Sequence, residues 1–235
     1  MTLPPKPPGL LRLASYNIRK AVGLDWRRDP GRIMRILSGL SADVVFLQEA
    51  DRRLGPRPSV LNRGKIAQDL GLDVAPVALN SVSLGWHGNA VLIRPDFRMG
   101  EIERITLPGI EPRGAVLVPV ETPHGPLHLV GVHLGLRRRC RLAQVDAIRK
   151  HLGPQRERRA LIVGDFNEWR KTALSPFEDL HVTAPGRSFH ASMPLLALDR
   201  IVHGPDLRLD ASGVVQTPLT RRASDHLPIW CDVAL

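Results

Sequence analysis

The segment Leu161-Ile162-Val163-Gly164-Asp165-Phe166-Asn167 places two polar side chains directly after a short apolar run. The apolar run is typical of a buried strand. Asp165 and Asn167 alternate along the strand-like extension, so we expect both on the same face, while Phe166 points the opposite way into the core. The segment therefore predicts a core strand that delivers two polar groups to its end.

Four other segments repeat this arrangement. Each follows or closes an apolar run that is typical of a strand, and they are Ser15-Tyr16-Asn17, Gln48-Glu49, Val132-His133 and Ser224-Asp225-His226. Their carboxylate, amide and imidazole groups are suited to binding metal ions and phosphate. Five such sets at strand ends indicate that polar side chains far apart in the sequence are delivered to a common kind of position.

Strand patterns dominate the middle of the chain, and amphipathic helices interrupt them. The expected strands cover residues 10–15, 43–47, 74–77, 90–93, 102–107, 115–120, 127–132, 161–163, 200–202, the region around Val214, and 229–233. Helices are expected after Asp29-Pro30, after Ser59 as a cap, and over 138–152 with Gly153 ending the helix. The pattern predicts an α/β protein with antiparallel sheet in its middle section.

Length and patterning favour one folded unit. The chain has 235 residues and 43% hydrophobic residues, enough for a single core. We expect one domain over residues 10–235 after a proline-rich lead at 1–9, and a long loop over the weakly patterned residues 175–194. No segment approaches ~20 uninterrupted apolar residues, so we expect no transmembrane helix.

The charge is strongly positive. The chain contains 33 Lys and Arg residues, nearly all of them Arg, and has a formal net charge of +10. A positive field attracts phosphate-bearing polymers and anionic lipid head groups, although an excess of Arg also arises from GC-rich codon usage. Cys140 and Cys231 form no C-x-x-C pair, and the N-terminus has no signal-peptide pattern, so we expect reduced thiols in a monomeric cytoplasmic protein.

Taken in order, the motifs resemble those of the endonuclease/exonuclease/phosphatase superfamily, which includes DNase I-like nucleases. The resemblance rests mainly on Gly164-Asp165-Phe166-Asn167, on Ser224-Asp225-His226-Leu227-Pro228 and on Gln48-Glu49, and it spans residues 10–235. It implies a four-layer α/β sandwich, in which two mostly antiparallel β-sheets pack face to face with helices outside. It also implies an active site at one edge, between the strand ends.

Hydrolysis of a phosphodiester requires charge neutralisation and an aligned water molecule, and a hard divalent cation with oxygen ligands supplies the first. Glu49 is the leading candidate ligand for Mg²⁺, with Mn²⁺ as an alternative ion. The resemblance implies that Asn17 and Asp225 lie beside it as direct or water-bridged ligands. Outside this context, Glu49 would be interpreted as a solvated carboxylate and Asn17 as a turn residue.

The resemblance also assigns catalytic roles. It implies that Asp199 is the carboxylate partner of His226, which would act as a general base or as a cation that contacts phosphate. Asp165 and Asn167 would divide two tasks, orienting the attacking water and donating to a phosphate oxygen. His133 would contact phosphate or protonate the leaving group, with a buried structural histidine as the alternative.

Two further residues complete the expected site. Arg113 matches a position where relatives often keep an arginine near the phosphate, and its planar guanidinium suits bidentate contact. Asn89 resembles an asparagine at a strand start that positions neighbouring groups. Trp26, Trp86 and Trp169 lie in loops beside the motifs, where they would either stack on a base or anchor their loops; we favour anchoring because Trp is highly buried on average.

The leading hypothesis is a Mg²⁺-dependent phosphodiesterase that acts on nucleic acid, DNA foremost, as an endonuclease or exonuclease. The basic charge and the pair His133 and His226 favour it. A second hypothesis keeps the chemistry and changes the substrate to a phospholipid head group or a phosphorylated small molecule. A non-catalytic binding module is the third, and the complete set of carboxylates and imidazoles argues against it.

Overall fold

Two six-stranded sheets form the centre of the computed structural model, which describes residues 3–170, 177 and 179–235. In spatial order the first sheet holds β11 (Arg208–Val214), β12 (Ile229–Ala234), β1 (Leu11–Asn17), β2 (Val44–Gln48), β4 (Ala90–Ile93) and β3 (Asp73–Val74). The second holds β5 (Glu103–Leu107), β6 (Arg113–Val120), β7 (Leu127–His133), β8 (Ala160–Asp165), β10 (Asp199–His203) and β9 (His181–Thr183).

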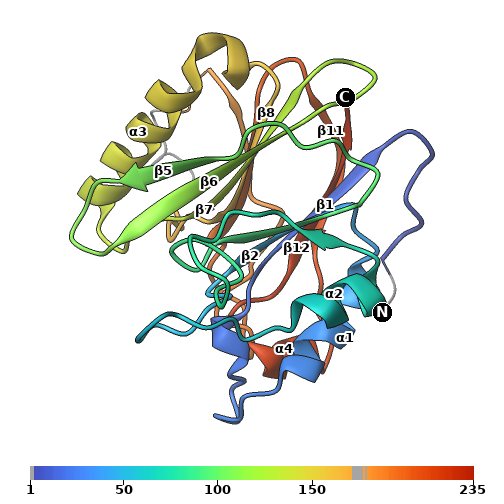
Figure 1. Cartoon of the computed structure of the whole chain (residues 1–235), viewed down its shortest axis with the longest axis vertical. Helices are drawn as coiled ribbons and strands as arrows, with labels where there is room; N and C mark the ends of the chain where they lie inside the picture. Colours follow the sequence, from blue (N-terminus) through green and yellow to red (C-terminus); the bar gives the residue numbers. More distant parts are fainter. Residues whose placement is uncertain (1–2, 171–176, 178) are drawn as a thin grey trace.

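Each sheet contains one parallel pair, β1 with β2 and β7 with β8, and its other neighbours are antiparallel. A parallel pair needs a crossover connection. The crossovers are α1 (Pro30–Leu40) and α3 (Arg138–Glu157), and α2 (Arg63–Leu70) packs beside α1. The helices thus form the outer layers on opposite sides of the paired sheets (Figure 1), and the predicted four-layer sandwich is confirmed.

Three apolar cores fill the spaces between the four layers. In β2, Val44 and Phe46 point between the sheets, while Val45 and Leu47 point toward α1. The central strands of the second sheet are likewise apolar on both faces, one toward the first sheet and the other toward α3. Because both faces are covered, these strands appear in the sequence as continuous apolar runs.

One of the expected helix boundaries is confirmed at the level of single residues. The side chain of Asp29 accepts a hydrogen bond from the backbone N–H of Arg32 at 2.9 Å, with Pro30 in the first turn. The prediction that Ser59 caps the second helix is wrong. Asn62 is the cap and accepts from the N–H of Lys65, while the Ser59 hydroxyl bonds within the preceding loop.

The expected long loop over 175–194 is interrupted by β9, although residues 175, 176 and 178 lie outside the described residues. A short helix, α4 (Thr220–Ala223), and a 3₁₀ turn, η1 (Arg19–Ala21), lie in loops that follow β11 and β1. No helix among the described residues combines the length and the apolar character needed to cross a bilayer.

A buried ion pair joins β1 to β12 on the helix side of the first sheet. Arg12 and Asp232 face each other in the strand register, and the guanidinium donates two hydrogen bonds of 2.7 Å to the carboxylate. Both side chains are 2% exposed, and Arg12 also lies over the ring of Trp230. Such a pair is demanding, because removal of one partner leaves the other charge buried without compensation.

We expect Asp232→Ala to lower the free energy of unfolding by about 3–5 kcal/mol, since Arg12 would remain buried and unpaired. Replacing both partners by apolar residues, as Arg12→Met with Asp232→Leu, should be much less destabilising. Urea denaturation followed by circular dichroism measures both. A single variant as stable as the unmodified chain would contradict this interpretation of the pair.

Candidate active site

The ends of β1 and β2 are tied together by their backbones. Asn17 lies opposite Gln48 in the parallel register, and the N–H of Ile18 donates to the carbonyl of Gln48 at 3.0 Å. Two residues later the N–H of Lys20 donates to the carbonyl of Glu49, also at 3.0 Å. The loop after β1 therefore holds the ammonium of Lys20 next to the carboxylate of Glu49.

The backbone at this edge adopts left-handed conformations that non-glycine residues rarely take. Among the described non-glycine residues, those with positive φ are Arg19, Lys20, Ala21, Trp26, Ser41, Glu49, Arg57, His87 and Asn167. All except Ser41 lie in loops at the edge where β1, β2 and β8 end. Strain of this kind persists where the surrounding structure imposes it and gathers at functional sites.

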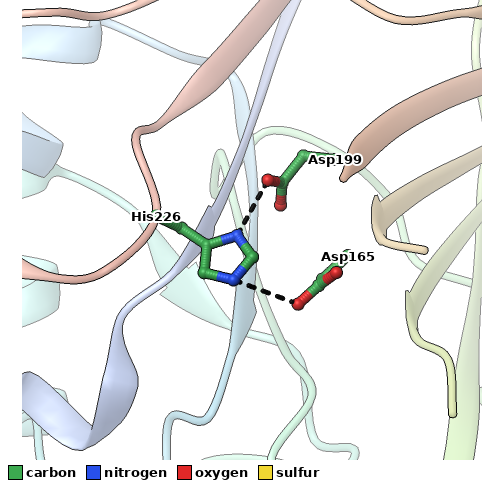
Figure 2. Close-up of side chains that lie close together, drawn as sticks. All are labelled: Asp165, Asp199 and His226. Atoms are coloured by element: carbon green, nitrogen blue, oxygen red, sulfur yellow. Dashed lines mark hydrogen bonds and ion pairs between the residues drawn. The ribbon is translucent and has the colours of Figure 1, made fainter. Parts of the chain in front are cut away.

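Three side chains meet across the two sheets (Figure 2). His226 comes from the loop before β12, whereas Asp199 begins β10 and Asp165 ends β8. The His226 Nδ1 lies 2.9 Å from Asp199 Oδ2, and its Nε2 lies 3.5 Å from Asp165 Oδ2. Ser188 also donates to Asp199 through its hydroxyl. Asp199 therefore fixes the ring, and the other nitrogen faces Asp165.

Asp165 is the hub of the site. Its Oδ2 accepts a hydrogen bond from Asn17 Nδ2 at 3.0 Å and lies 3.4 Å from His133 Nε2. Its Oδ1 accepts from the backbone N–H of Asn167 at 2.9 Å, and the Asn167 side chain donates to the carbonyl of Leu134. The carboxylate is 1% exposed, so a closed set of donors holds it in place.

The two histidines that flank Asp165 have opposite protonation tendencies. For His226, burial favours the neutral ring, but the charges of Asp199 and Asp165 outweigh burial and raise its pKa to about 10. For His133, burial dominates and lowers the pKa to about 3, with the positive charges of Arg113 and His226 acting in the same direction. Near neutral pH the site thus holds one charged and one neutral imidazole.

A cavity of about 360 Å³ opens beside these groups. Its lining residues include Glu49 and His133, which come from two of the strand-end motifs, and the expected phosphate contact Arg113. Lys20, Arg53, Arg57 and His87 add further basic side chains to the wall. The cavity is therefore suited to a compact anion that reaches the neighbourhood of Asp165.

Arg113 lines the cavity, whereas Asn89 does not. Arg113 is half-buried in the cavity wall, and burial lowers its pKa against the opposing charges of Asp165, Glu111 and Glu49. Asn89 is 1% exposed, does not line the cavity, and donates from its side-chain amide to the carbonyl of Gly114 at 2.8 Å. Its contact fixes the strand start that carries Arg113, so its geometry is that of a positioning residue.

Oxygen donors for a metal ion lie at two places in the described structure. Glu49 faces the cavity, where Lys20 and Arg53 contact its carboxylate, the latter at 3.5 Å. Asp225 Oδ2 lies 3.6 Å from Nε of Arg19, and the side-chain oxygen of Asn17 accepts a hydrogen bond from the backbone N–H of Arg19. These are hard oxygen groups of the kind that Mg²⁺ prefers, and their present neighbours are cations.

Asp165, Asp199 and His226 form a separate cluster, whose possible ligand atoms lie within 4.8 Å of one another. Its chemistry differs, because a protonated imidazole has no lone pair for a metal ion, and the pKa of His226 is raised to about 10. This cluster is better suited to holding a proton between carboxylates. The hard oxygen groups of Glu49, Asp225 and Asn17 fit a divalent cation more closely.

Several residues at the site were not identified from the sequence. Lys20 and Arg53 contact Glu49, and His87, which belongs to none of the motifs, lines the cavity. The spacing of Arg53, four residues after Glu49, could have suggested that pair. Ser188 contacts Asp199 from the weakly patterned segment, where no motif marks it.

The tryptophans correct another expectation. Trp26 and Trp169 are 79% and 53% exposed, so neither is the buried loop anchor that average burial predicts. Trp26 instead carries the guanidinium of Arg19 on its face at 4.8 Å. Trp86 is half-buried and packs against Gly114, where a Cβ atom would lie 2.2 Å from the ring.

Comparisons with known proteins identify a matching family and a related sequence. The sequence profile of the Endonuclease/Exonuclease/phosphatase family matches residues 14–226. Protein YbhP of Escherichia coli strain K12 is 35% identical over 219 residues, which cover 83% of this chain and 85% of YbhP.

Solved structures share the fold at low sequence identity. D. rerio TDP2 complexed with a single-strand DNA product is 17% identical, with a TM-score of 0.71 over 95% of this chain and 98% of that one. A mannosyl-6-phosphatase of Bacteroides thetaiotaomicron is 18% identical, with a TM-score of 0.72 over 96% of this chain and all of that one.

In the metal-free protein, we expect His226 to remain protonated at pH 8 and His133 to remain neutral at pH 5, because their pKa values are about 10 and about 3. Histidine ring ¹⁵N shifts measured by NMR in EDTA report both states. The raised pKa of His226 also means that the protonated ring contributes to the free energy of unfolding. This contribution is fully present below pH ~6.5 and is lost as the pH rises toward 10. Titration of either ring near its unperturbed pKa would contradict the geometry of the site.

Proposed function

The chain belongs to the endonuclease/exonuclease/phosphatase family, whose members are divalent-metal-dependent hydrolases of phosphoester bonds, and from that premise we propose that it is a metal-dependent phosphodiesterase. The observation that supports this proposal most directly is the arrangement around Asp165, where a charged and a neutral imidazole flank one buried carboxylate next to a basic cavity. Hydrolysis of an anionic ester needs such a combination of positive charge and a water-orienting group.

In this proposal, His226 is the cation that contacts phosphate. Its proton on Nδ1 is held by Asp199 at 2.9 Å, so its Nε2–H is directed toward the side of Asp165. Of the two roles that the sequence leaves open, the raised pKa favours the charged donor over the general base. Asp165 then orients the attacking water, with Asn17 and the backbone of Asn167 keeping its carboxylate in position.

Arg113 and His133 complete the phosphate pocket. Both line the cavity, and a guanidinium offers a fork of N–H donors to phosphate oxygens. His133 is neutral, so of its two expected roles the contact with phosphate through its single ring N–H is favoured over protonation of the leaving group. Asn89 keeps the strand start of Arg113 in place through Gly114.

Glu49, with Asn17 and Asp225, would hold the divalent cation, Mg²⁺ foremost and Mn²⁺ as the alternative. Their carboxylate and amide oxygens are hard ligands of the kind that such a cation prefers, and the contacts of Lys20 and Arg53 with Glu49 place positive charge at its carboxylate. When bound, the ion supplies Lewis-acid stabilisation of the charge that develops on the phosphate oxygens.

Nucleic acid, DNA foremost, is the first candidate substrate. The net charge of +10, the basic cavity and the exposed rings of Trp26 and Trp169 support it, since phosphate contact and base stacking are how single strands bind. A phosphodiester in a phospholipid head group is the second candidate. The exposed aliphatic side chains in the loops at the edge that carries the site favour this candidate.

We expect Glu49→Gln and His226→Ala each to lower kcat/KM for a soluble bis-aryl phosphodiester about 10³-fold, because one removes the cation ligand and the other the phosphate contact. The assay compares Mg²⁺, Mn²⁺ and EDTA, with release of the aryl alcohol as the readout. Glu121→Gln and His124→Ala are matched controls, since both side chains are exposed in a distant turn. Activity near the unmodified level in either site variant would refute the assignment.

A further inference from the structure

Large apolar side chains are exposed almost exclusively at the edge that carries the site. The loops there follow β1, β2, β3, β5, β7, β8, β9 and β11, because these strands all end at the edge where Asn17, Asp165 and His226 meet. Nine large apolar side chains in these loops are 45–85% exposed, namely Trp26, Leu54, Leu79, Val82, Ile110, Leu136, Trp169, Met193 and Leu195. We call them the apolar rim.

The opposite edge is different. Within the described residues its loops, at 41–43, 71–72, 94–102, 121–126 and 204–207, contain no large apolar side chain of comparable exposure. The single remaining case is Val182, which is 37% exposed on β9. Exposed apolar residues scattered over a surface need no explanation, but their collection at one edge of the sheets does.

Positive charge accompanies the apolar rim. The arginines that are mostly exposed in the same loops and in the first turn of α3 are Arg27, Arg28, Arg52, Arg53, Arg137, Arg138, Arg139, Arg170, Arg187, Arg221 and Arg222. Among the described residues of these loops, the carboxylate that is exposed in the same way is Asp179. The other carboxylates there are less exposed, and some are engaged with cations, as Asp25 is with Arg32 and Arg222. The edge therefore presents apolar side chains within a field of arginines.

The chemistry of the apolar rim separates three possible occupants. Seven of its nine side chains are aliphatic, and an aliphatic side chain offers no ring on which a nucleic acid base can stack. A protein partner, including a second copy of this chain, favours a contiguous apolar interface core with a polar rim, whereas the apolar side chains here stand in separate loops with arginines between them. A bilayer surface accepts separate apolar side chains at the acyl boundary and pairs arginines with lipid phosphates.

We propose that this edge docks on the surface of an anionic phospholipid bilayer, with the cavity facing the head groups. The docking surface stands on the distribution of exposed side chains alone. The identity of the substrate rests on the proposed function: a head-group phosphodiester, in which water forms one new P–O bond, one P–O ester bond breaks, and the leaving oxygen takes up a proton.

Sedimentation with lipid vesicles tests the docking surface with the full chain. One vesicle type is phosphatidylcholine alone, and in the other phosphatidylglycerol replaces about a third of the lipid. We expect binding to the anionic vesicles to be stronger by about tenfold or more. The triple variant Leu54→Ser/Leu79→Ser/Met193→Ser should lower the partition coefficient on anionic vesicles by about tenfold or more, because three apolar insertions are lost.

Matched controls keep the test specific. Val182→Ser removes an exposed apolar side chain away from the docking edge and should bind vesicles like the unmodified chain. The triple variant should hydrolyse the soluble bis-aryl phosphodiester at the unmodified rate, which shows that its fold and site are intact. Glu49→Gln should bind vesicles while it fails to hydrolyse, so that failure of the catalytic proposal and failure of docking give different results.

Three outcomes would overturn the proposal. The first is absence of binding to anionic vesicles, and the second is undiminished binding by the triple variant. The third is that the apolar rim serves another occupant. Size-exclusion chromatography would then show a dimer that the triple variant dissociates, or the triple variant would lose affinity for single-stranded DNA while vesicle binding stays unchanged.

Discussion

One contact across the seam between the two sheets organises the molecule. His226, supplied by the first sheet, lies between Asp199 and Asp165 of the second, with Nδ1 2.9 Å from the former. Because the carboxylates are buried, they keep the proton on the ring and the ring in one orientation. Asn17 adds a second bridge to Asp165 from β1. The sheets must pack in one relative position for both bridges to form, so the sandwich and the site specify each other.

The strand-end motifs led to the architecture through the family resemblance that they carry, and the apolar runs that they close independently indicated strands alternating with helices. The resemblance also identified Asp165, Asp199 and His226, which the structure brings together. Capping of the second helix was missed, since Ser59 and Asn62 are both good caps and only the tertiary course of the loop distinguishes them. The ion pair of Arg12 with Asp232 was also missed, because register over more than two hundred residues is not visible in a local pattern.

The exposure of side chains is the property that the sequence conveyed least. Net charge suggested a polyanionic partner, and DNA was the first choice, but charge alone does not distinguish one phosphate-bearing partner from another. Leu54, Leu79 and Ile110 are ordinary apolar residues in the sequence, and only the fold shows that they are exposed in loops at the edge of the sheets that carries the site. Left-handed residues such as Glu49 and Lys20 gather at the same edge. Strained backbone, basic charge and exposed aliphatic groups thus coincide where the chemistry is placed.

The relation of the metal ligand to the imidazoles can be measured without turnover. Mn²⁺ broadens NMR signals of nuclei near its binding site, and Glu49 lines the same cavity as His133, which in turn lies near Asp165 and His226. Substoichiometric Mn²⁺ should broaden the ring signals of His133 and His226 and spare that of the distant His124, and Glu49→Gln should abolish the effect. Broadening that ignores both site histidines, or that persists unchanged in Glu49→Gln, would contradict a single metal-dependent site at the seam of the two sheets.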